Sequence, residues 1–271
     1  MRLDQPDLRT DVQVFVYSVS SAFTWTKPTD AQLVHVTLIG GGGGGGSGRR
    51  GAAGTYRGGG SAGGGGAWNT AVFAAGLLPD TVAITAGRGG TGSTARTTDN
   101  TDGANGTVGG VSSFGTYLRA TGGQRGEGGF NAEAASPTVD TPSMIPAARS
   151  QPYNAATTST SNDALGAPAG GFGGFIDASE NVALGNAGGL SLMSNYAFTR
   201  STAGLPGTDS PAGVYAPGSG GGGGSPSGTL TGGAGGLYGC GGGGGAGVTN
   251  GTSSGAGGAG GHGLVVVVSY F

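Results

Sequence analysis

Hydrophobic residues in this chain are confined to short stretches that lie between long runs of glycine. Residues 12–17 (VQVFVY), 33–39 (LVHVTLI) and 81–86 (TVAITA) alternate apolar and polar positions, a period of two that is typical of β-strands. Residues 111–120 (VSSFGTYLRA) predict a further strand, and the chain closes on GLVVVVSYF. The run of four valines indicates a strand that is buried on both faces.

No apolar stripe with a period of 3.6 residues is long enough for a helix, so we expect almost no α-helix. None of the predicted strands would be stable alone. We therefore expect one β-sandwich or jelly-roll-like unit, in which residues 12–39 pair beside the C-terminal strand. The predicted fold class is mainly β and irregular, with glycine-rich excursions that leave the sheet and return to it.

Glycine accounts for 68 of the 271 residues, which excludes an ordinary aliphatic core throughout the chain. This content is typical either of a flexible spacer or of backbones packed directly against one another. In the stretch GAGGAGGHG the exceptions Ala256, Ala259 and His262 are three residues apart. Three residues per turn is the period of the left-handed polyproline II helix, so we favour an ordered bundle of polyglycine II helices.

In such a bundle each backbone N–H and C=O needs a partner on an adjacent helix, and a Cβ on a packed face would separate the two helices. We expect these excursions at residues 40–66 and 218–263. Ordering glycine costs about 1–2 kcal/mol of backbone entropy per residue, so the sheet must close the bundle. The structural glycines that we single out are Gly40, Gly43, Gly46, Gly222, Gly243, Gly257 and Gly260.

The glycine-rich β domain is expected to span residues 22–271, with an irregular Ser/Thr/Ala-rich insertion at 128–216. Two interpretations of the insertion stay open: loops that cap the bundle, or a recognition surface, because aromatic and adaptable polar residues make good contact area. Residues 1–21 precede this domain, and within them 12–17 is interpreted as an unpartnered strand suited to strand addition. The candidate recognition aromatics are Tyr153, Phe172, Phe175, Tyr196 and Phe198.

Motifs for nucleotide binding are not supported by their context. A GxGxxG pattern begins at Gly40 after a predicted strand, but the stretch that follows it, SGRRGAAGTYRGGG, cannot form the helix of a dinucleotide fold. Lys27 is followed by Pro28, so it does not belong to a P-loop. The near-neutral net charge of −2 argues against nucleic acid as a partner. We predict no cofactor.

Candidate catalytic and metal-binding residues are equally sparse. Cys240 is the only cysteine, and the only histidines, His35 and His262, lie at opposite ends of the sequence. We interpret both histidines as structural. Asp99 and Asp102 are assigned to a solvated loop, since a calcium loop would need a glutamate at the right spacing. We predict no catalytic residue, no metal site and no enzyme.

Targeting signals are also absent from the sequence. The N-terminal residues are polar where a secretory signal needs an apolar core, and the longest apolar run, 264–268, is too short to cross a bilayer. We expect synthesis as a soluble cytoplasmic product, without a membrane partner.

Five stretches in order resemble the glycine-rich minor tail proteins of long-tailed bacteriophages that infect mycobacteria and related actinobacteria. They are FTWTKP (23–28), VHVTLIGGGGGGG (34–46), GLLPDTVAITAGRGGTG (76–92), GGVSSFGTYLRATGG (109–123) and GHGLVVVVSYF (261–271). The resemblance covers about two thirds of the chain and leaves out 130–215. It implies a virion component of the tail tip or its fibres, assembled in the host cytoplasm, with no catalytic residues. The resemblance also suggests that residues 1–21 are an N-terminal attachment segment to another tail protein.

The resemblance leads to a structural and adhesive function in tip assembly and host adsorption. Other tail proteins would be its partners, together with a host envelope glycan or receptor. We also expect a homo-oligomer, with a trimer favoured over a bundle made by one chain. The alternatives are a bacterial surface or extracellular glycine-rich structural protein and, less favoured, an envelope-degrading tail enzyme, which would need a carboxylate pair or a metal cluster.

Overall fold

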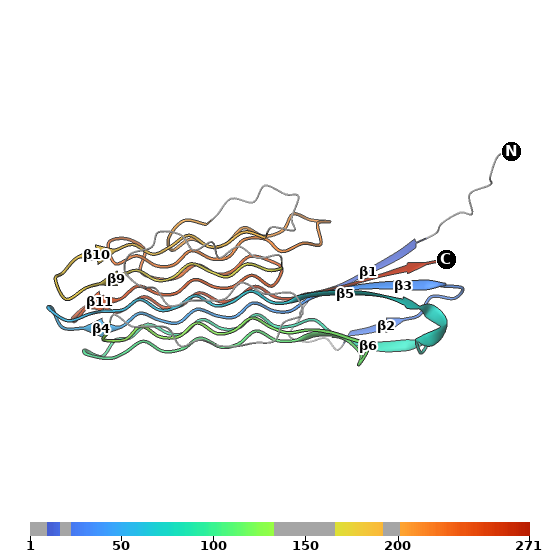
Figure 1. The fold of residues 1–271 in the computed structure, drawn as a ribbon, viewed down its shortest axis with the longest axis horizontal. Coiled ribbons are helices and arrows are strands. Elements are labelled where there is room, and N and C mark those ends of the chain that lie inside the picture. The colour runs from blue at the N-terminus through green and yellow to red at the C-terminus, as the bar shows by residue number, and fades with distance from the viewer. Residues whose placement is uncertain (1–9, 17–22, 133–165, 192–200) are drawn as a thin grey trace.

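The computed structural model describes residues 10–16, 23–132, 166–191 and 201–271. The molecule is elongated, with a β-sandwich at one end and a bundle of extended segments that run back and forth along the long axis (Figure 1). All described strands of four or more residues belong to the sandwich. The predicted mainly β and irregular fold is confirmed.

Two four-stranded antiparallel sheets form the sandwich. The order in the first sheet is β1 (Thr10–Val16), β12 (Leu264–Tyr270), β3 (Leu33–Ile39) and β5 (Trp68–Ala74). The order in the second sheet is β2 (Phe23–Thr26), β6 (Thr81–Thr85), β7 (Ser112–Phe114) and β8 (Leu118–Ala120).

The C-terminal strand β12 holds the first sheet together. It pairs with β1 on one side and with β3 on the other along its whole length, so the predicted pairing beside this strand is confirmed for residues 12–16 and 33–39. Within the predicted range 12–39, β2 instead pairs with β6 in the second sheet. The expectation that residues 12–17 form an unpartnered strand is wrong, because β1 pairs with β12 from Thr10 to Val16. The physical reason is that an apolar strand gains more from joining an existing sheet than from staying single.

Successive side chains of each strand point to opposite faces of its sheet, and those that point between the two sheets form the core. This core includes Trp25, Val34, Val36, Ile84 and Phe114. Val265 and Val267 of β12 point into this core. Leu264 and Val266 point to the other face of the sheet, where they pack with Ala167 from the bundle. The burial of this valine run on both faces, which the sequence predicted, is confirmed for 264–267.

Helix is almost absent, as predicted. In the part of the chain that the structure describes, the single helix is the 3-10 turn η1 (Ala75–Leu77). No helix there is long and apolar enough to cross a membrane.

Residues 40–48 form one centre of the bundle, and the nine N–H groups of this segment all donate to other segments at 2.8–3.0 Å. Gly40, Gly43 and Gly46 donate to the segment 58–67. Gly41, Gly44 and Ser47 donate to 104–110, and Gly42, Gly45 and Gly48 donate to 255–263. The carbonyl groups accept from 87–93, 121–130 and 239–247. A period of three with every bond made to a neighbour is the polyglycine II arrangement, so this part of the prediction is confirmed.

Residues 239–247 form a second centre, surrounded by 40–48, 58–67, 168–174, 218–225, 230–236 and 255–263. The bundle is therefore larger than the predicted excursions 40–66 and 218–263. The described parts of the insertion 128–216 contribute the segments 168–174, 183–189 and 202–208 to the bundle, where we expected either capping loops or a recognition surface. The reason is local: GGFGG at 170–174 leaves two bare positions in each turn, which is enough for close packing on two sides.

Candidate functional site

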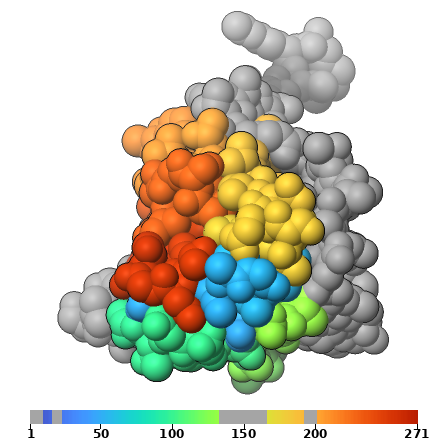
Figure 2. All heavy atoms as spheres, turned by 90° about the vertical axis from the view of Figure 1, so that its left-hand side faces the viewer, coloured from blue at the N-terminus to red at the C-terminus, as the bar shows by residue number. Residues whose placement is uncertain are grey.

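The end of the bundle away from the sandwich is a compact face made of loops, which we call the tip (Figure 1, Figure 2). It is formed where outgoing segments turn into returning ones. In the view of Figure 2, stretches from most of the described chain meet in this one face. The loops that form the tip are 49–57, 97–103, 175–183, 226–229 and 248–254.

Short strands tie these loops to one another. β4 (Arg50–Gly51) pairs in parallel with β11 (Val248–Thr249), and β9 (Phe175–Ile176) pairs with β10 (Val182–Ala183) in an antiparallel hairpin. Single bridges join Arg50 to Thr101 and Arg57 to Ile176. The loops 49–57, 97–103, 175–183 and 248–254 are thus connected and not independent.

Arg57 is the main side-chain link among these loops. Its guanidinium is fully buried and donates to both carboxylate oxygens of Glu180, at 2.9 and 3.0 Å. It also donates to the hydroxyl of Thr249 and to the carbonyl of Asp177, both at 2.9 Å. A bidentate arginine–carboxylate pair has a fixed geometry, so this contact sets the position of 177–180 against β11.

Two more arginines of the tip have carboxylate partners. Arg49 pairs with Asp102, and Arg50 pairs with Asp99 at 2.6 Å between Nη2 and Oδ1. The arginine side chains are about nine-tenths buried, whereas the two aspartates are more than half exposed. Asp99 and Asp102 therefore belong to ion pairs. The described part of the chain contains no group of three His, Cys, Asp or Glu residues that could hold a metal ion.

The carboxyl groups of the 175–183 loop have lowered pKa values. Hydrogen bonds from Arg57, and then from the N–H of Gly54, lower the pKa of Glu180. The side chain and the N–H of Asn181 lower the pKa of Asp177. Both groups favour the folded state in their charged form, so their contribution to stability is present above their unfolded pKa values of about 4 and is lost below them.

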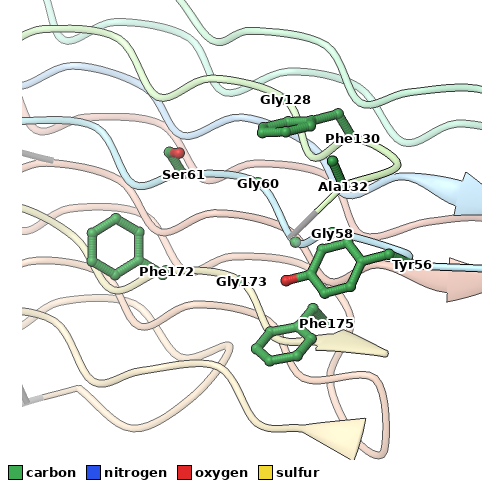
Figure 3. Close-up of a pocket in the computed structure, with 11 residues that line it drawn as sticks. Tyr56, Gly58, Gly60, Ser61, Gly128, Phe130, Ala132, Phe172, Gly173 and Phe175 are labelled. Carbon is green, nitrogen blue, oxygen red and sulfur yellow. The ribbon is translucent and has the colours of Figure 1, made fainter. Parts of the chain in front are cut away.

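A small hollow lies on the side of the bundle close to the tip (Figure 3). The rings of Tyr56 and Phe175 stack beside it with centroids 5.2 Å apart, and Phe130 and Phe172 complete the apolar lining. The cavity measures about 30 Å³, which is room for one or two water molecules and too little for a sugar ring. We assign no ligand to it.

The two candidate recognition aromatics that fall within the described residues, Phe172 and Phe175, do not lie on an exposed surface. Phe172 and Phe175 are 3% and 5% exposed, because the segment that carries them packs against 58–67. Their rings contribute to internal packing and are not available to a partner. Tyr153, Tyr196 and Phe198 lie outside the described residues.

The structural glycines are found in the bundle. A Cβ added to any of the seven would lie 1.9–2.2 Å from a backbone oxygen of a neighbouring segment, a separation that real Cβ atoms do not show. The glycines are Gly40, Gly43, Gly46, Gly222, Gly243, Gly257 and Gly260.

A family model described as a glycine-rich domain matches residues 18–270, which include the bundle and all strands from β2 to β12. The chain belongs to the glycine-rich domain family. No curated protein matches this chain.

Sequence reasoning did not find the ion pairs of this glycine-rich domain. Arg57 and Glu180 are 123 residues apart, and nothing in a single sequence relates two such positions. The one local signal is an arginine placed directly before the glycines of 58–60, where a long charged side chain at the end of a bundle segment needs a partner.

Proposed function

We propose that this glycine-rich domain protein is a structural minor tail protein of a bacteriophage tail tip or fibre, which contributes to tip assembly and to adsorption to the host surface. The observation that carries the proposal is that the sandwich and the tip lie at opposite ends of the molecule (Figure 1). The N-terminal strand β1 and the C-terminal strand β12 pair in the sandwich, and the loops of the tip lie at the other end of the bundle. Attachment through the sandwich would place the tip outermost.

The hydrogen bonding of the bundle supports the role of a stiff spacer. Residues 40–48 are bonded to six surrounding segments, so bending the bundle would break bonds in several directions at once. Stiffness holds the tip at a constant distance from the attachment end. A spacer of this kind acts through its shape and needs no catalytic group.

The chemistry of the tip supports contact with a polar host surface such as a glycan. Its exposed side chains include hydroxyl and amide groups and the carboxylates of Asp99, Asp102 and Glu180, all of which form hydrogen bonds with polyols. The arginines beneath them are held in ion pairs. On this proposal the tip replaces the insertion aromatics as the host-facing surface, and other tail proteins contact the sandwich.

Adsorption of phage particles tests both parts of the proposal. In particles that contain the chain, Thr252→Arg with Ser253→Arg at the tip is expected to lower the adsorption rate at least about 10-fold, because two long cations disturb a polar contact surface. The matched control is Thr94→Arg with Thr91→Arg on the side of the bundle, which is expected to leave adsorption unchanged. Unchanged adsorption for the tip variant would overturn the adhesive role and keep the scaffold role.

Immunoblotting and gold labelling of purified particles test the location. Label at the tail tip is expected, and particles without the chain would overturn the tail assignment in favour of a bacterial surface protein. A zymogram on host envelope material separates the third alternative. Clearing by the purified chain would overturn the non-enzymatic proposal.

A further inference from the structure

In the outer segments of the bundle, residues with a side chain recur at every third position and are separated by pairs of glycines. In 255–263, a Cβ on Gly257 would lie 2.0 Å from a backbone oxygen of 40–48, and a Cβ on Gly258 would lie 2.0 Å from a backbone oxygen of 230–236. These two registers therefore face neighbouring segments. The third register contains Ala256, which is half-buried, and Ala259, which is exposed. Their side chains face neither of these two segments.

The adjacent outer segment 230–236 follows the same rule. Gly232 faces 239–247 and Gly233 faces 202–208, with added Cβ atoms 2.1 and 1.8 Å from backbone oxygens there. Thr231 and Ala234 occupy the third register and are exposed. We call the outward positions Thr231, Ala234, Ala256 and Ala259 the open flank.

The open flank already presents backbone hydrogen-bond donors that a further segment would need. The N–H groups of Ala256 and Ala259 have no hydrogen-bond partner within the described chain, while their carbonyls accept from Gly232 and Gly235 at 2.9 and 2.8 Å. The two free donors are one turn apart, about 9 Å in a polyglycine II helix. In residues 40–48, donors at this spacing all find carbonyls on a neighbouring segment.

We propose that the side chains of the open flank prevent a second copy of this chain from adding a segment to the bundle. The occupant that they exclude is another copy of this chain. The free donors of the open flank have the same spacing as the donors inside the bundle, and the chain contains glycine segments of the same length as the flank. A methyl group is sufficient for this, since in the interior a Cβ would fall about 2 Å from the neighbour's carbonyl oxygen. The flank thus limits the bundle to a single chain.

The corresponding experiment removes the four side chains. In sedimentation velocity, the variant Thr231→Gly/Ala234→Gly/Ala256→Gly/Ala259→Gly is expected to form a species of about twice the chain mass or larger as concentration rises. The matched control replaces the same four residues with serine, which keeps every Cβ, and is expected to sediment as the wild type does. Hydrogen exchange at Ala256 and Ala259 is expected to slow at least about 10-fold in the associated glycine variant only.

Two results would overturn the proposal. One is a glycine variant that is folded, as judged by slow exchange of the amides of 40–48, and that sediments as the wild type does at every concentration. The other is a wild-type chain that already associates and becomes smaller with Ala234→Lys/Ala259→Lys, since the flank would then be an interface. If the fourfold variant does not fold, Ala256→Gly/Ala259→Gly with its serine counterpart gives the same comparison.

Discussion

At the scale of the residue, the space at the Cβ position decides what a glycine contributes. Gly43 lies in the centre of the bundle, where a Cβ would be 1.9 Å from the carbonyl oxygen of Gln124. Gly76 lies in η1 with no atom within 4 Å of that position and without a left-handed φ. The same amino acid is therefore required for packing at one site and replaceable at the other.

Gly43→Ala is expected to lower the free energy of unfolding by at least about 3 kcal/mol, because the methyl group forces two hydrogen-bonded segments apart. Gly76→Ala is the control and is expected to leave stability unchanged or raise it by up to about 1 kcal/mol, through the lower entropy of its unfolded chain. Denaturant unfolding measures both. Equal stabilities of the two variants would contradict the close packing of the bundle.

His262 makes stability depend on pH. Its Nδ1 accepts a hydrogen bond from the N–H of Gly89 at 2.9 Å, which requires an unprotonated nitrogen. Burial, and then the charge of Arg88, lower the pKa of His262. The unfolded chain, with a pKa of about 6.5, then binds the proton more readily than the folded chain, so stability falls as the pH decreases through 6.5 towards the folded pKa.

This dependence is expected to appear as a decrease of the melting temperature between pH 7.5 and pH 5.5. His262→Asn keeps an acceptor that does not titrate, and its melting temperature is expected to vary less over the same interval. Parallel curves for the wild type and the variant would show that His262 does not carry the effect.

At the scale of the element, long-range contacts hold the tip loops in place. Arg57→Met is expected to destabilise the protein by about 2–4 kcal/mol, since it removes four hydrogen bonds around a buried guanidinium and leaves Glu180 without its partner. Hydrogen exchange in 175–183 is expected to accelerate first. Arg125→Met changes an exposed arginine in the same way and is expected to cost no more than about 0.5 kcal/mol.

The strands and the bundle segments differ in how well the sequence predicted them. Long strands such as β3 and β12 follow from the period of two and were predicted almost to their ends. The segment 168–174 was not predicted, although Ala169, Phe172 and Phe175 are three residues apart. The surrounding sequence is rich in Ser, Thr and Ala, a composition typical of irregular structure, and it concealed this spacing. We therefore expected capping loops or a recognition surface there.

At the scale of the whole molecule, the sandwich and the bundle depend on one another. Leu264 and Val266 pack with Ala167 across their junction, and glycine segments alone do not bury enough apolar surface to offset their entropy. Val267→Asp, which places a charge in the sandwich core, is expected to lower stability by more than about 3 kcal/mol and to abolish the protection of the 40–48 amides in the same transition.

The control for this prediction is Val72→Asp in the same sheet, where the side chain is 61% exposed and a cost of about 0.5 kcal/mol is expected. Hydrogen exchange measured along a denaturant series reports both parts of the molecule at once. A bundle that remains protected after the sandwich has unfolded would contradict their mutual dependence.

The amino-acid sequence by itself determined the two periods of this protein, two in the strands and three in the glycine segments, because the direction of successive side chains follows from the local backbone. It also determined that residues 264–267 of the C-terminal strand are buried on both faces. Tertiary structure decided which segments surround 40–48 and 239–247, and it joined Arg57 to Glu180. Bare glycine segments are nearly alike, so their neighbours are selected by chain connectivity and by the few side chains at their edges and ends.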